Sequence, residues 1–156
     1  MRRPARALAA VAAAVLPVLF AAGCGDDRAT KVVVGRSMPA EQVQRYAPGH
    51  PARALLELIQ GAQHNDPAAI VSRLTPQWGA TPERLAEAMP RITRLTQAFG
   101  TPHVLAVRRR GGRAAVELRW GGQRGTFILV TGRRGWRLAR ILVGGHRLKI
   151  AGLESP

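Results

Sequence analysis

The side chains that could carry out chemistry in this 156-residue chain are few and scattered. Its four histidines stand at positions 50, 64, 103 and 146, a spacing that matches no metal-ligand pattern, so we expect no metal site. Proton abstraction would need a general base, and the two carboxylates to weigh are Glu57 and Glu117. The residue pattern puts Glu57 on the polar face of a helix and Glu117 beside arginines on the outer face of a strand. With no nucleophile motif or phosphate-binding loop either, we expect no catalytic residue, no cofactor and no enzymatic activity.

The single cysteine, Cys24, follows a segment with the layout of a secretory signal peptide. Two arginines after Met1 precede an apolar stretch over 7–22, which is too short for a membrane-spanning helix. The run Ala21-Ala22-Gly23-Cys24 resembles the lipobox of bacterial lipoproteins, although alanine stands at 21 where leucine is commonest. The resemblance implies cleavage after Gly23, palmitate or another acyl chain on Cys24, and an anchor on the outer face of the bacterial cell membrane. An ordinary signal peptide followed by a free thiol is the alternative.

Composition changes along the chain predict one folded domain. We expect a signal peptide over 1–23, a flexible tether over 24–48, a domain over 49–150 and a disordered tail over 151–156. The chain has no second cysteine, so no internal disulfide can form and the domain depends on its hydrophobic core.

The first part of the domain has the period of helices. From Pro51, apolar residues recur at i, i+3, i+4 and i+7 and predict a first helix. Asp66 is the expected cap of a short second helix, and a third is expected from Thr81 to Gly100. We expect Pro90 to kink or split the third helix, because proline removes a backbone hydrogen bond.

After residue 102 the period becomes two, which is typical of strands. Four strand-length runs, separated by two Gly-Gly pairs and one Gly-Arg-Arg-Gly loop, predict three consecutive hairpins over 104–109, 113–120, 123–130 and 136–143. The predicted fold is α+β, with three N-terminal helices packed on a curved four-stranded antiparallel sheet.

Turn lengths predict the register of these hairpins. Two-residue turns set Leu105 and Val107 opposite Leu118 and Val116, and Val116 opposite Phe127, which makes one face apolar. The other face is expected to hold arginines together with Glu117.

Carried through the last hairpin, this register pairs Leu129 with Leu138 and Phe127 with Arg140. Arg140 would then face inward, where an unpaired arginine is costly unless it reaches solvent or an anion. We expect a pocket for an acidic or amphipathic small molecule, lined by Arg140, Trp136, Phe127 and Trp120. The alternative is an arginine stem that lies over apolar surface with its head in water.

The order of elements resembles the nuclear transport factor 2-like superfamily, whose cone-shaped α+β folds include SnoaL-like and ketosteroid-isomerase-like proteins. The resemblance covers 51–143 and rests on the Leu55-Leu56-Glu57-Leu58-Ile59 helix, the Asp66-Pro67 helix start and the closing Gly135-Trp136-Arg137-Leu138 strand. Enzymes of this superfamily hold an acid or a histidine inside the cone. Because no such inward group is predicted here, the resemblance favours a non-catalytic binding or scaffolding domain, with an isomerase-like or dehydratase-like enzyme as an alternative.

Charge gathers in the second half of the chain. Residues 101–156 hold 12 Lys or Arg against two acids, whereas 24–100 hold nine against seven. Export argues against nucleic acid as a partner, so the basic sheet predicts contact with anionic lipid or wall polymer instead. An arginine-rich composition, with 22 of the 24 basic residues arginine, is the alternative explanation. Binding to a protein partner, or a homodimer that forms through an exposed sheet face, is a further alternative.

Overall fold

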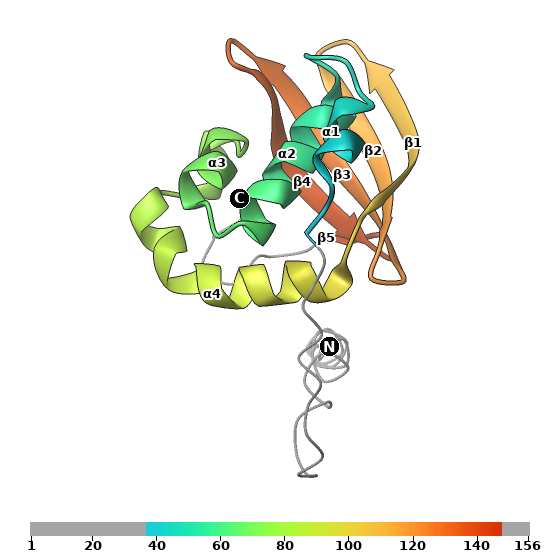
Figure 1. Cartoon of the computed structure of the whole chain (residues 1–156). Coiled ribbons are helices and arrows are strands. Elements are labelled where there is room, and N and C mark those ends of the chain that lie inside the picture. The colour runs from blue at the N-terminus through green and yellow to red at the C-terminus, as the bar shows by residue number, and fades with distance from the viewer. Residues whose placement is uncertain (1–36, 148–156) are drawn as a thin grey trace, which may run out of the picture. The chain divides into compact units, whose positions relative to one another are not determined.

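The computed structural model describes residues 37–147. The predicted signal peptide, Cys24 and the tail over 151–156 lie outside these residues. Helices come first and a five-stranded antiparallel sheet follows, in the strand order β1-β2-β3-β4-β5 (Figure 1). The elements are α1 (Ala40–Gln44), α2 (Pro51–Gln63), α3 (Pro67–Ser72), the 3-10 helix η2 (Pro76–Trp78), α4 (Pro82–Phe99), β1 (His103–Arg110), β2 (Arg113–Trp120), β3 (Gln123–Gly132), β4 (Gly135–Val143) and β5 (His146–Arg147).

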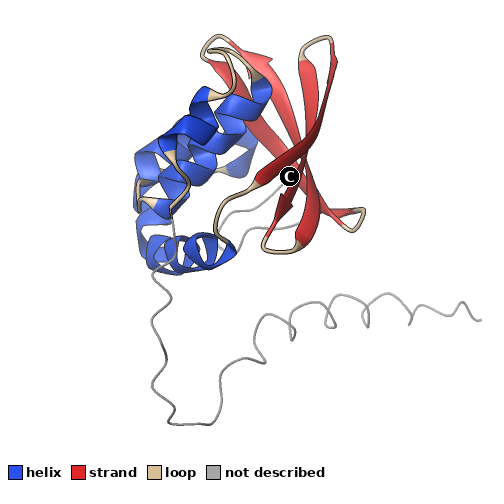
Figure 2. Ribbon diagram, turned by 45° about the vertical axis from the view of Figure 1, so that its right-hand side comes forward, coloured by secondary structure: helices blue, strands red, loops and turns tan. Residues whose placement is uncertain are grey.

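The helices lie together on one side of the sheet, and the other side carries no helix of the described part (Figure 2). The predicted α+β class and the four predicted strands are therefore confirmed, and β5 is an addition. It follows a third Gly-Gly turn, at Gly144 and Gly145, where φ is 59° and 80°. These values lie in the left-handed region, which glycine enters without steric cost.

Local signals in the sequence start and end the helices where they were expected. Asp66 caps α3 by accepting the Ala69 N–H at 2.9 Å, and Thr81 caps α4 by accepting the Arg84 N–H at 3.3 Å. Gly100 ends α4. The helix continues through Pro90, so the alternative in which it splits there is wrong.

The predicted tether is too long, because its last part belongs to the folded domain. Met38 is buried, and so is Val43 in α1. The Met38 N–H donates to Gln63 Oε1 at 2.7 Å, which fastens the start of the described chain to the end of α2. The sequence pattern missed this segment because its few apolar residues show no clear period.

The hairpin turns set the register where the strands are regular. Val116 lies opposite Val107 and Phe127, and Leu129 lies opposite Leu138, as predicted. Arg133 and Arg134 form the turn between β3 and β4, because Gly132 and Gly135 on either side already pair.

Two β-bulges overturn the rest of the predicted register. In β1 the shift between Val104 and Ala106 puts Val104 opposite Leu118 and leaves Leu105 exposed. In β4 a second shift pairs Arg140 with Ile128, where Phe127 was expected. One inserted residue reverses the face of every side chain beyond it, so Arg140 turns outward and is exposed.

The core lies between the helices and the inner face of the sheet. One buried cluster joins α2 to β2, β3 and β4, and a second joins α3, η2 and α4 to β4. Trp78 belongs to the second cluster, and its indole N–H donates to the Leu138 carbonyl at 2.9 Å. The Leu138 N–H in turn donates to the Arg73 carbonyl at 2.7 Å, so the chain after α3 is tied to the edge of β4.

Candidate functional site

The aromatic residues predicted to line a pocket are part of this core. Trp136 is 5% exposed, and its indole N–H donates to the Gly49 carbonyl at 2.8 Å. The guanidinium carbon of Arg109 lies 5.4 Å from the centre of the Trp136 ring, in a cation–π contact. Trp136 is thus held by the loop before α2 and covered by an arginine of β1.

The other two predicted aromatics are half-buried beside the same core. Trp120 donates its indole N–H to the Gly100 carbonyl at 2.8 Å and meets Phe99 edge to face, with ring centres 5.5 Å apart. Phe127 packs against both buried clusters. Trp120, Phe127 and Trp136 therefore lie on one side of the sheet, as predicted. They pack in and against the core.

Arg140 does not join them. It is exposed on the opposite face, beside Ile128. The predicted inward arginine is wrong, and the physical reason is the bulge in β4 described above. The polar group on which the predicted interior pocket depended is therefore on the outside of the sheet.

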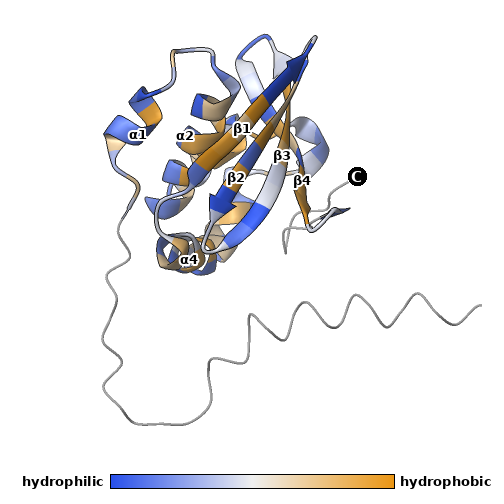
Figure 3. Cartoon of the chain, turned by 90° about the vertical axis from the view of Figure 1, so that its right-hand side faces the viewer, coloured by the Kyte–Doolittle hydropathy of each residue, from blue (hydrophilic) through white to orange (hydrophobic). Residues whose placement is uncertain are grey.

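The outer face of the sheet collects arginines from four strands. Paired residues share a face, so the register places them in rows across the sheet. One row reads Arg110, Arg113, Val130, Arg137 from β1 to β4, and the next reads Arg108, Ala115, Ile128, Arg140. Arg119 and Arg124 pair with each other nearer the other end of β2 and β3. Figure 3 shows hydrophilic stretches in blue on β1 and β2, beside hydrophobic stretches in orange.

We call these seven residues the outer arginine face: Arg108, Arg110, Arg113, Arg119, Arg124, Arg137 and Arg140. Glu117 is the carboxylate among them, and its Oε1 lies 3.2 Å from Arg108 Nη2 in an exposed cross-strand ion pair, as the alternation predicted. Such a pair contributes little to stability, about 0–1 kcal/mol. The other six arginines of the face form no ion pair with Glu117.

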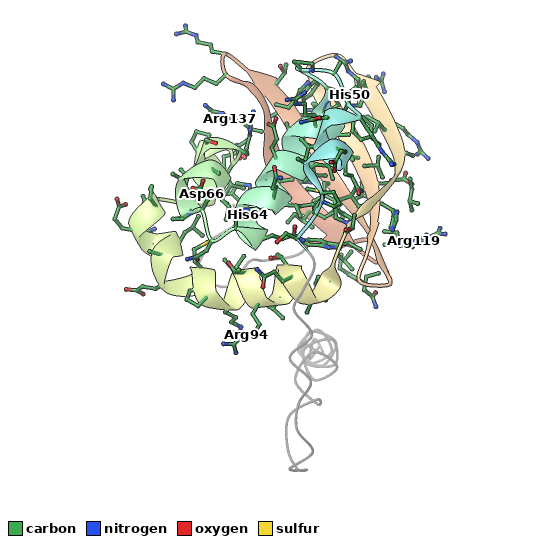
Figure 4. All side chains as sticks on the ribbon, viewed as in Figure 1. His50, His64, Asp66, Arg94, Arg119 and Arg137 are labelled. Carbon is green, nitrogen blue, oxygen red and sulfur yellow. The ribbon has the colours of Figure 1, made fainter. Side chains whose placement is uncertain are left out.

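Charge divides between the two layers. Within the described residues, 101–147 carry 11 arginines and one acid, whereas 37–100 carry six arginines and five acids. The sheet is strongly positive and the helical layer is nearly balanced. Arg119 projects from the sheet and Arg94 from α4 (Figure 4).

Neither carboxylate weighed as a general base is free. Glu117 is paired as described, and Glu57 is half-buried between two arginines. Glu57 Oε1 accepts from Arg53 Nε at 3.0 Å, and Oε2 accepts from Arg73 Nη2. Over 37–147, no group of three or more metal-ligating side chains could hold an ion. No described helix has the length and apolar character needed to cross a bilayer.

His50 is a titratable group at the start of α2. Its Nδ1 accepts the Ala52 N–H at 3.2 Å and caps α2, and its ring stacks on Tyr46 with centres 5.1 Å apart. Burial, and then the charge of Arg109, lower the pKa of His50 below its ordinary value. The imidazole is therefore neutral at pH 7, which is the form that the cap requires.

Two features of the structure were not predicted from the sequence. Glu57 was expected on a polar helix face, but its ion pairs with Arg53 and Arg73 were not expected. The contact of Arg109 with Trp136 on the inner face was not expected either, although the alternation of residues along β1 indicates that Arg109 faces inward.

Comparisons with protein-family models, with curated proteins and with solved structures each give no match for this chain.

Proposed function

We propose that this protein is a non-catalytic interaction module whose outer arginine face binds the anionic headgroups of a membrane. The observation that carries the proposal is the collection of seven arginines from four strands on one face with a single carboxylate. Arginine is suited to this task because its planar guanidinium matches phosphate oxygens with paired hydrogen bonds. Each well-placed arginine contributes about 1 kcal/mol near an anionic surface.

Two further features support a lipid surface as the partner. The apolar side chains of Ala115, Ile128 and Val130 lie between the arginines, so the face offers both charge and apolar contact to headgroups. If Cys24 is acylated, as its lipobox resemblance implies, only the 13 residues 25–37 lie between the anchor and Met38. That length of chain spans about 50 Å at most, which keeps the domain close to the bilayer.

A small ligand inside the cone is less well supported. The aromatics proposed to bind it pack in the core, and Arg140 lies outside. A homodimer through the outer arginine face is disfavoured because it would press two strongly positive surfaces together. Membership of the nuclear transport factor 2-like superfamily stays a proposal, supported by the order of helices and strands.

The test measures how the full chain partitions onto vesicles of phosphatidylglycerol and of phosphatidylcholine. The variant carries Arg119→Gln and Arg140→Gln, and the control carries Arg45→Gln and Arg94→Gln. All four arginines are exposed and form no ion pair within the described residues. Both variants lose two charges, and any contribution of the N-terminal segment is common to them.

The sheet variant should bind phosphatidylglycerol about 30-fold more weakly, which corresponds to about 2 kcal/mol for two charges. The control should lose less than about threefold, and wild-type binding should weaken as salt increases. Equal losses in the two variants, or binding that does not depend on salt, would show that the outer arginine face is not the contact surface.

A further inference from the structure

A cleft beside the helices holds a second, separate concentration of arginines. It has a volume of about 240 Å³ and lies where the start of α2, the end of α3 and the turn between β3 and β4 meet. Its walls include His50, Arg53, Glu57, Arg73, Arg134 and Trp136. None of these residues belongs to the outer arginine face.

Three guanidinium groups and one carboxylate leave this cleft positive. Glu57 binds Arg53 through Oε1 and Arg73 through Oε2 and can neutralise one of the two. Arg134 stands in the turn and has no carboxylate partner among the described residues. His50 adds no charge at pH 7, because its pKa is lowered. The excess is therefore two positive charges.

Further hydrogen bonds hold Arg53 and Arg73 beside the cleft. Arg53 lies on α2, where its Nη1 also donates to the Tyr46 carbonyl at 3.3 Å. Arg73 ends α3, and its backbone carbonyl accepts the Leu138 N–H of β4. The turn between β3 and β4 lies beside Arg73, since a Cβ at Gly135 would lie 4.0 Å from Arg73 Nη1.

Each guanidinium has five N–H donors, and Glu57 uses only part of them. The remaining donors of Arg53 and Arg73 can meet a second anion alongside the carboxylate. A phosphate group is a better match than a monocarboxylate, because it carries about 1.5 to 2 negative charges near pH 7. A cleft of about 240 Å³ is smaller than those that hold drug-sized ligands, which occupy about 300–1,000 Å³.

We propose that this cleft binds the phosphate group of a small molecule, either free phosphate or a compact phosphate monoester. Arg53 and Arg73 form the fixed part of the site, and Arg134 closes over the anion from the turn. A second cleft, of about 390 Å³, shares Glu57 and Arg73 as a common wall, so the organic part of a monoester has space beside the site. This proposal is independent of membrane binding by the outer arginine face.

Titration calorimetry of the full chain at 150 mM sodium chloride tests the site, with inorganic phosphate and glycerol 3-phosphate as probes. Arg134→Gln is the first variant, and Arg133→Gln is its control, since both residues are exposed in the same turn and only Arg134 lines the cleft. A variant of an exposed turn residue should fold normally. Arg73→Gln is the second variant.

Arg134→Gln should weaken phosphate binding about tenfold, the usual effect of one charge-assisted hydrogen bond, and Arg133→Gln less than twofold. Arg73→Gln should abolish binding. Tighter binding of glycerol 3-phosphate would identify a monoester as the ligand, and tighter binding of inorganic phosphate would identify the free ion. Equal weakening by Arg133→Gln and Arg134→Gln, or no phosphate binding above the sodium chloride background, would overturn the proposal.

Discussion

Gln63 is the polar side chain on which the packing of the helical layer most depends. It is 1% exposed, and it lies at the end of α2. Its Oε1 accepts the Met38 N–H at 2.7 Å, and its Nε2 donates to the carbonyls of Thr96 at 3.2 Å and Gly100 at 3.0 Å. One amide at the end of α2 therefore joins the segment before α1 to the end of α4.

Replacing Gln63 with leucine keeps the size of the side chain and removes all three hydrogen bonds. The Met38 N–H is left buried without this acceptor, and the Thr96 carbonyl loses its donor, whereas the Gly100 carbonyl keeps the Trp120 indole. A buried unsatisfied group costs about 1–3 kcal/mol, and Thr96 lies in a partly solvated position. We expect Gln63→Leu to lower the free energy of unfolding by about 2–4 kcal/mol, out of about 5–15 kcal/mol for a typical domain.

Urea unfolding of the full chain, followed by tryptophan fluorescence, measures this loss. Gln60→Leu is the matched control, because Gln60 lies on the same helix and its side chain forms no hydrogen bond within the described residues. The control should change the free energy of unfolding by less than about 0.5 kcal/mol. A loss below about 1 kcal/mol in Gln63→Leu would refute the view that this amide holds the residues before α1 to the domain.

Two further predictions concern a turn and a helix cap. Gly121→Ala should destabilise the domain more than Gly111→Ala, as compared by thermal unfolding, because both residues have positive φ but only at Gly121 would a Cβ meet another residue, Phe99, at 2.5 Å. Equal losses would contradict this account of the turn. The pKa of His50 is lowered in the folded state, so the unfolded state binds more protons below pH 6.5 and stability should fall as pH drops through that value. His50→Asn keeps a capping acceptor for Ala52 and should reduce this pH dependence of the melting temperature; an unchanged dependence would assign it to other groups.

Elements set by neighbouring residues could be predicted well. The caps at Asp66 and Thr81 act within three residues of their own position, and Gly-Gly turns decide the hairpins on either side of them. The pair Val116–Phe127 follows from the Gly121-Gly122 turn, and the pair Leu129–Leu138 follows from the Arg133-Arg134 turn. These interactions are local, so a short stretch of sequence contains the information that determines them.

The sequence alone therefore determined the α+β order, the helix caps, the hairpins and the concentration of arginine in the sheet. Only the tertiary structure decided which arginines face outward, because the bulge in β4 moves Arg140 to the other face. It also decided that Met38 belongs to the domain, through a hydrogen bond to a residue 25 positions away, and that Arg53, Arg73 and Arg134 share one cleft. The physical reason is that one inserted residue reverses a strand's faces, and its position depends on how the curved sheet fits the helices, which no local pattern records.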